Sequence, residues 1–123
     1  MKLNFDQVRQ GDVLLVRADK MPSWAKEAQR DDHGRVVVEY GESSGHGHAF
    51  RGAGVTGFRA ETSEMAAMAG LDAVLVGGST ALLRHEFADG RHAEHEPVAL
   101  APGAWVRAIQ VEYDPDQEQR VAD

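Results

Sequence analysis

The sequence of 123 residues contains no cysteine, which excludes disulfide bonds, thiolate metal sites, iron–sulfur clusters and a cysteine nucleophile. It also has no hydrophobic run of the length that crosses a membrane, and we expect no secretion signal in residues 1–6. Positive charge is scarce, because 13 Lys and Arg stand against 20 Asp and Glu, giving a formal net charge of −7. This balance argues against nucleic acid and against an anionic membrane surface as partners. We therefore expect a soluble cytoplasmic domain.

Short apolar segments separated by turn signals make up most of the sequence and predict a mainly β fold. The expected strands cover residues 12–18, 35–40, 71–76, 81–87, 91–100 and 105–113. Asp89 and Gly90 form a dipeptide that accepts left-handed backbone angles, so the strands on either side of it are expected to pair as a β-hairpin.

Two short helices are expected between these strands. One covers 24–30 and begins after the N-cap Ser23, and the other covers 62–70. The chain length favours one domain, over 1–113, followed by an acidic polar tail over 114–123. The predicted fold is a small barrel or sandwich with one or two short helices.

Six histidines are the one compositional excess of this sequence. His46 and His48 are separated by one residue, so on an extended segment their side chains lie on the same face, about 6–7 Å apart. Gly45 and Gly47 add little bulk around them. This spacing allows two imidazoles to share one metal ion. The alternative is a polar loop whose histidines are solvated.

A second group of histidines lies in the predicted hairpin. With a two-residue turn, His85 lies opposite Glu94 and shares one face of the sheet with His92 and Glu94. Glu86 and His95 then lie on the other face, unless a β-bulge returns His95 to the first. The hairpin therefore predicts two or three imidazoles and a carboxylate on one side of a sheet. The alternative is an exposed, charged hairpin.

Taken together, the two groups match a mononuclear site for a divalent transition metal, namely zinc, iron, manganese, nickel or copper. The predicted metal ligands are His46, His48 and His95, with His92 or His85 completing the set. The predicted catalytic residues, each as a ligand or a general base, are Glu94 and Glu86. An open coordination position would activate water or hold an oxygen of a small polar substrate. The alternative function is a non-catalytic module that contacts a protein partner, with exposed histidines that confer pH sensitivity.

Four segments also carry a resemblance to a known family: Arg9–Leu15 (RQGDVLL), Gly41–His48 (GESSGHGH), His92–Leu100 (HAEHEPVAL) and Gln110–Tyr113 (QVEY). In this order they resemble the RQGDV, GExT/SGHxH, HxEHxPIxLP and QREY segments of a widespread set of small, functionally uncharacterised bacterial and phage proteins. The resemblance implies that one site contains His46, His48, His92 and His95. It implies no particular reaction.

Overall fold

The computed structural model describes residues 6–40, 46–61, 63 and 70–108, and these residues form ten β-strands and no helix. The strands are β1 (Gln7–Gln10), β2 (Val13–Ala18), β3 (Lys26–Ala28), β4 (Val36–Tyr40), β5 (His46–Phe50), β6 (Val55–Arg59), β7 (Ala73–Val76), β8 (Ala81–Phe87), β9 (Val98–Leu100) and β10 (Gly103–Ala108). The mainly β prediction is confirmed. None of the described residues belongs to a helix that is long and apolar enough to cross a membrane.

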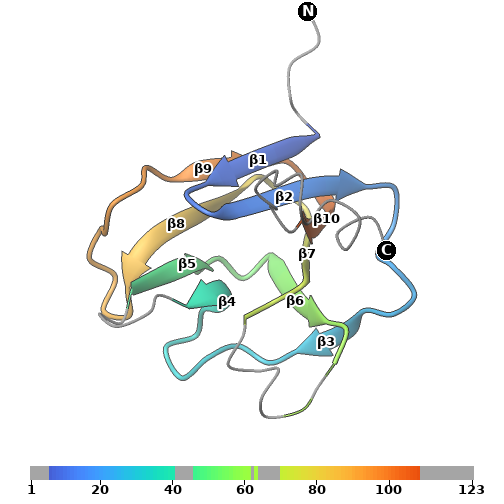
Figure 1. The fold of residues 1–123 in the computed structure, drawn as a ribbon, viewed down its shortest axis with the longest axis horizontal. Coiled ribbons are helices and arrows are strands. Elements are labelled where there is room, and N and C mark those ends of the chain that lie inside the picture. The colour runs from blue at the N-terminus through green and yellow to red at the C-terminus, as the bar shows by residue number, and fades with distance from the viewer. Residues whose placement is uncertain (1–5, 41–45, 62, 64–69, 109–123) are drawn as a thin grey trace, which may run out of the picture.

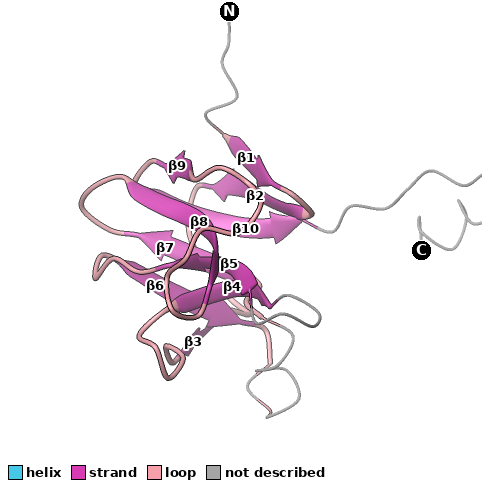
Figure 2. Ribbon diagram, turned by 90° about the vertical axis from the view of Figure 1, so that its left-hand side faces the viewer, coloured by secondary structure: helices cyan, strands magenta, loops and turns pink. Residues whose placement is uncertain are grey.

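The strands form two antiparallel sheets, as Figures 1 and 2 show. The larger sheet has the order β1-β2-β10-β7-β6-β3, and the smaller has the order β4-β5-β8-β9. The edge strands β1 and β9 contact each other, and β4, the other edge of the smaller sheet, contacts β6, which lies next to the edge strand β3. The two sheets share no ladder of hydrogen bonds at either place. The arrangement is therefore sandwich-like, and it is not a closed barrel.

The hydrophobic core lies between the two sheets. The larger sheet contributes alternate residues of its central strands, including Val13, Leu15 and Trp105, and the smaller sheet contributes Phe50 and Leu83. Each of these five residues is at most 1% exposed. Complete burial of a side chain of this size contributes about 1.5–3 kcal/mol. The core therefore fixes which face of β5 and of β8 points inward.

The helix predicted over 24–30 is wrong. Lys26–Ala28 forms β3 instead, and it pairs antiparallel with β6 at the edge of the larger sheet. A helix of seven residues is marginal on its own, so backbone pairing with an open sheet edge outweighs its local propensity. The helix predicted over 62–70 lies almost entirely outside the described residues. The tail over 114–123 and residues 109–113 of the last predicted strand also lie outside the described residues. The described part of that strand belongs to β10.

The predicted hairpin is present in part. Of the strand expected at 91–100, only β9 (Val98–Leu100) is a strand, and the turn is longer than expected. The amide of Phe87 donates to the carbonyl of Arg91 at 2.8 Å, and Glu86 is bridged to His92. Three residues, 88–90, therefore make the turn, and Gly90 ends it with a φ of +94°. Left-handed backbone at the last turn residue is typical of three-residue hairpin loops.

This one-residue difference reverses the predicted faces, because side chains alternate along a strand. The expectation that His92 and Glu94 share a face with His85 is wrong, since His92 lies opposite Glu86. His95 instead lies beside His85, with a distance of 5.0 Å between the ring centroids. The register changes between the Glu86–His92 bridge and the Leu83–Val98 pair, so the alternative in which an irregular backbone returns His95 to the face of His85 agrees with the structure, and the face of Glu86 does not.

Candidate functional site

Two neighbouring strands of the smaller sheet carry histidines on their inner face. His48 lies directly opposite His85 in the register of β5 and β8. Each is two residues from a core side chain of its own strand, Phe50 and Leu83 respectively, so alternation turns both imidazoles toward the interior. His46, two residues before His48, lies on the same face at the start of β5. The histidines therefore continue the hydrophobic core at one end.

Four imidazoles contact one another at this end, and we call His46, His48, His85 and His95 the histidine cluster. The ring of His85 lies at its centre, stacked on His48 with the centroids 4.4 Å apart and meeting His46 edge to face at 4.9 Å. The ring of His95 lies 5.0 Å from His85 and 6.1 Å from His48. Segments that are far apart in the sequence thus bring their imidazoles to one place. A metal-binding role for them stays a prediction.

The other residues predicted for the site lie outside the cluster. His92 is exposed and is bridged to Glu86. Glu94 is also exposed, and its backbone amide rather than its carboxylate meets the cluster. Glu86 is 1% exposed and lies on the opposite face of β8, where its Oε2 accepts a hydrogen bond from Arg51 Nε at 2.7 Å. The structure therefore separates both predicted carboxylates from the imidazoles.

His85 is held by backbone groups of the segment that follows the hairpin. Its Nδ1 accepts the amide of Glu94 at 3.0 Å and the amide of His95 at 3.1 Å. A neutral imidazole carries one proton, so that proton lies on Nε2, which donates to His46 Nδ1 at 3.2 Å. Burial lowers the pKa of His85, and the neighbouring His46 and His95 lower it further. His85 thus holds two other members of the cluster in place.

His48 is a buried imidazole whose hydrogen-bond partner comes from the larger sheet. It is 6% exposed, and its Nδ1 lies 2.8 Å from Oε1 of Gln10 at the end of β1. Burial is the main cause that lowers its pKa from 6.5 to about 4, and charge on His85 and His95 adds to the effect. His48 is therefore neutral at pH 7, which is the form that binds metal ions.

Gly11 leaves room between two imidazoles. A Cβ atom at this position would lie 2.8 Å from His95 Nε2 and 3.3 Å from His48 Cε1. The φ of Gly11 is +58°, a conformation that side chains other than glycine rarely adopt. In the sequence, Gln10 and Gly11 stand directly before the strand expected at 12–18, and their contact with the histidines was not predicted from that position. The signal that links them to the site was the resemblance, because its RQGDV segment accompanies the histidine segments.

Arg107 and Glu39 also lie beside the cluster, and sequence reasoning missed both. Glu39 is opposite His48 in the register of β4 and β5. The Arg107 guanidinium pairs with the Glu39 carboxylate and donates to the carbonyl of Val38 at 3.1 Å. Its positive charge contributes to the low pKa of His48. An ion pair thus ties β10 of the larger sheet to β4 next to the imidazoles.

Comparison with known families gives one match, to a domain of unknown function, DUF8820, over residues 9–110. The chain belongs to this family. The matched residues include the whole histidine cluster, Gln10 and Gly11. No curated protein and no solved structure matches the chain.

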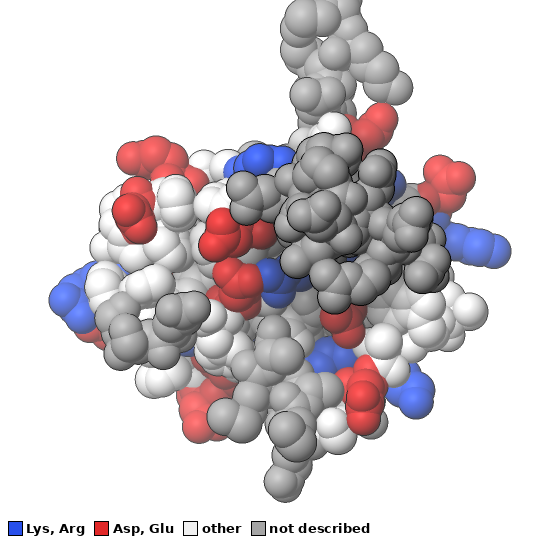
Figure 3. All heavy atoms as spheres, viewed as in Figure 1, with Lys and Arg blue, Asp and Glu red and all other residues white. Residues whose placement is uncertain are grey.

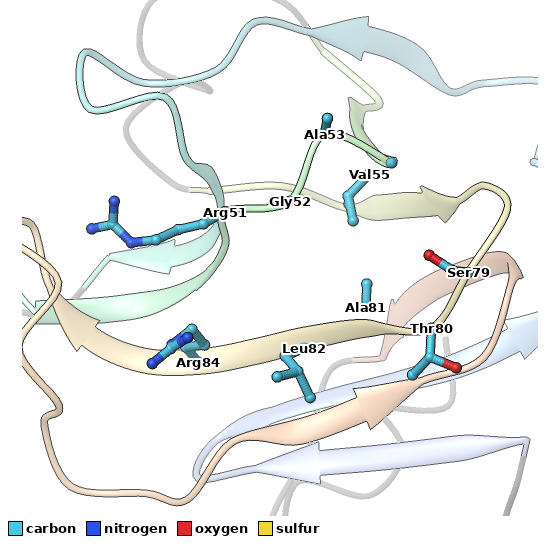
Figure 4. A pocket seen from close by; sticks show the side chains of 10 residues that line it. Arg51, Gly52, Ala53, Val55, Ser79, Thr80, Ala81, Leu82 and Arg84 are labelled. Carbon is cyan, nitrogen blue, oxygen red and sulfur yellow. The ribbon is translucent and has the colours of Figure 1, made fainter.

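Elsewhere the surface offers weaker candidates. Figure 4 shows a pocket of about 310 Å³ between the loop that follows β5 and the start of β8, with Arg51 and Arg84 at one end and Ser79 and Thr80 at the other. Arg51 is already engaged by Glu86, and no member of the histidine cluster lines this pocket. On the face shown in Figure 3, the described acidic and basic side chains are interspersed, and neither sign forms a continuous patch.

Proposed function

We propose that the histidine cluster binds one divalent transition metal ion: zinc, iron, manganese, nickel or copper. The observation that carries this proposal is the meeting of four imidazoles, with contacts of 4.4–6.1 Å between ring centroids, at the end of a hydrophobic core. Neutral imidazole nitrogens are the common ligands of these metals. Burial keeps His48 neutral at pH 7, so metal binding at this residue has little competition from protons.

His48 and His95 are the ligands that the geometry favours most. Both rings border the space in front of Gly11, with His95 Nε2 and His48 Cε1 within 3.3 Å of the same point. Nε2 of His48 is bonded to that Cε1, and its Nδ1 is already taken by Gln10, so Nε2 is the nitrogen left for a metal. The missing side chain of Gly11 leaves this space open, as an ion site requires.

His46 is the third proposed ligand, and it has to change its hydrogen bond first. Its Nδ1 accepts the Nε2 proton of His85. Among the described residues, no group of three His, Asp or Glu side chains already has an arrangement that could hold a metal ion. The proposal therefore includes a rotation of the half-buried His46 ring away from His85 on metal binding. His85 keeps its backbone hydrogen bonds and serves to orient its neighbours.

Three imidazoles leave at least one coordination position for water or for an oxygen of a small polar ligand. A bound metal would polarise that oxygen as a Lewis acid or lower the pKa of the water. The cluster itself contains no carboxylate, because Glu94 is exposed and Glu86 is held by Arg51 on the other face. The carboxylate that does lie beside the cluster is that of Glu39, opposite His48, and it is paired with Arg107. A general base for such chemistry would therefore be an imidazole of the cluster or, once released from Arg107, Glu39.

The test is a Co²⁺ titration of the untagged, metal-free protein, followed by visible absorption and by elemental analysis. We expect about one equivalent of metal, and at least about tenfold weaker binding in His48→Ala and in His95→Ala. His46→Ala should weaken binding as well. His92→Ala and His33→Ala are matched controls, because both histidines are exposed and lie outside the cluster.

Two results would overturn the proposal. One is less than about 0.1 equivalent of any of these metals bound at micromolar protein and metal concentrations. The other is a loss of binding in the two control variants that equals the loss in His48→Ala. In that case the metal would be held by exposed histidines rather than by the cluster.

A further inference from the structure

Gln10 is a buried amide that connects the two sheets at the histidine cluster. It is the last residue of β1 and is 2% exposed. Its Nε2 lies 2.9 Å from the carbonyl oxygen of Leu83 and 2.8 Å from that of Glu96. Its Oε1 lies 2.8 Å from Nδ1 of His48. Both ends of the amide therefore have close partners, and these partners determine which way the amide points.

Backbone carbonyl oxygens only accept hydrogen bonds, and the side-chain amide of glutamine has two N–H donors and one oxygen acceptor. The carbonyls of Leu83 and Glu96 therefore require the NH₂ group of Gln10. The amide oxygen is left facing His48, and an oxygen acceptor requires a donor. Nδ1 of His48 must carry the proton of that contact.

A neutral imidazole has a single N–H, so a proton on Nδ1 leaves a lone pair on Nε2. The free histidine side chain prefers the opposite arrangement, with its proton on Nε2. The hydrogen bond from His48 to Gln10 thus selects the less common tautomer. Nε2 of His48 lies next to Cε1, the atom that borders the space in front of Gly11.

We infer that Gln10 is a positioning residue, which fixes His48 as the Nδ1–H tautomer and presents its Nε2 lone pair to the space beside His95. That this lone pair binds a metal rests on the proposed function. A histidine ligand commonly donates its other N–H to a carbonyl or carboxylate oxygen, which sets its orientation and raises its basicity. Glutamate at this position would face the carbonyls of Leu83 and Glu96 with acceptors only, so the amide is specifically required.

The tautomer can be read directly in the metal-free, ¹⁵N-labelled protein from long-range ¹H–¹⁵N correlations of the imidazole rings. We expect a protonated Nδ1 and an unprotonated Nε2 for His48. In Gln10→Met this pattern should shift toward a protonated Nε2, because methionine keeps the length of the side chain and removes the acceptor. Gln7→Met makes the same change at an exposed position of the same strand and should leave His48 unchanged.

The second readout is metal affinity, for which we expect Co²⁺ to bind about 10- to 100-fold more weakly to Gln10→Met than to the unchanged protein or to Gln7→Met. A protonated Nε2 of His48 in the unchanged protein overturns the inference, even if Gln10→Met does not fold. An unaltered His48 pattern in folded Gln10→Met also overturns it. If the tautomer behaves as expected and no metal binds, the positioning role stands and the proposed function fails.

Discussion

His85 and Glu86 are neighbours in β8, and they end in opposite kinds of environment. His85 points inward to a network that comprises three other imidazoles and backbone amides. Glu86 points to the other face and meets the guanidinium groups of Arg51 and Arg35. Both side chains are at least 96% buried. The same strand thus buries polar groups in two ways. We call the inner group the neutral network, because burial lowers the pKa of His48 and of His85, and the outer group the charged network.

The two networks differ in how completely their atoms are paired. On the inner face, both ring nitrogens of His85 have hydrogen-bond partners, as do both ends of the Gln10 amide. On the outer face, the described residues provide no hydrogen-bond partner for Arg35 Nη1 or for Glu86 Oε1. Arg35 Nη1 lies 3.8 Å from Glu86 Oε2, which is an ion pair without a hydrogen bond. The unpaired atoms of the charged network cost stability, whereas the hydrogen bonds of the neutral network determine which imidazole nitrogens keep a lone pair.

The largest effect that separates the two networks is expected from Glu86→Gln. This change leaves Arg35, which is 4% exposed, with one carboxylate partner fewer. Removing one member of a buried ion pair costs about 3–5 kcal/mol, and the lower end applies here because Asp31 still pairs with Arg35. Urea denaturation measures the loss. The His48 tautomer and Co²⁺ affinity of the folded variant should stay unchanged.

Arg84→Ala is the control for this experiment. Arg84 also lies near Glu86, with its Nε 3.6 Å from Oε1, but its side chain is 47% exposed. Exposed ion pairs contribute little, so the expected loss is below about 0.5 kcal/mol. An equal loss in Arg84→Ala and Glu86→Gln would show that burial does not distinguish these pairs, and the contrast between the two faces of β8 would be wrong.

The neutral network should make stability depend on pH. The pKa of His48 is about 4 in the folded protein and 6.5 in the unfolded chain, so the unfolded chain binds more protons between these values. The free energy of unfolding is then complete above pH 6.5 and falls as the pH drops toward 4, by about 3 kcal/mol for this residue. The pKa of His85 is also lowered, which adds to the same trend. Urea denaturation of the metal-free protein at several pH values measures the slope.

His48→Gln should flatten this pH dependence, because the group that takes up the proton is gone. The exposed His92→Gln provides the matched control and should keep the slope of the unchanged protein. A stability that is independent of pH between 6.5 and 4 in the unchanged protein would contradict a neutral, buried His48. If the slope disappeared in His92→Gln and not in His48→Gln, the pH dependence would come from the exposed His92, and the explanation based on His48 would be wrong.

Features that depend on local periodicity were predictable from the sequence. The strands expected at 12–18, 35–40, 71–76 and 81–87 correspond to β2, β4, β7 and β8. The common face of His46 and His48 follows from side-chain alternation alone. These predictions need no knowledge of which strands pair, so nothing distant in the sequence could change them.

Features that depend on one residue of register, or on a distant partner, were not predictable. A turn of three residues rather than two moved His92 out of the site, and the irregular segment between His92 and Val98 brought His95 into it. The contact between Gln10 and His48 joins residues 38 positions apart, and it exists only because the end of β1 lies against the middle of β5. Glutamine before a turn glycine carries no local sign of such a contact.

The smallest expected effect concerns the space that keeps the neutral network open. Gly11→Ala forces a side chain into a φ of +58°, which costs about 1–2 kcal/mol. It also places a Cβ 2.8 Å from His95 Nε2, so His95 has to move. Gly34→Ala provides the matched control, because Gly34 has a φ of +74° and no atom within 4 Å of the added Cβ. Urea denaturation should show a loss of about 1–2 kcal/mol of unfolding free energy in both variants from the backbone conformation. Only Gly11→Ala should shift the imidazole signals of His95 and His48 and weaken Co²⁺ binding. Identical imidazole spectra for the two variants would mean that glycine is needed at position 11 for its backbone conformation only, and that the space before His95 has no part in the site.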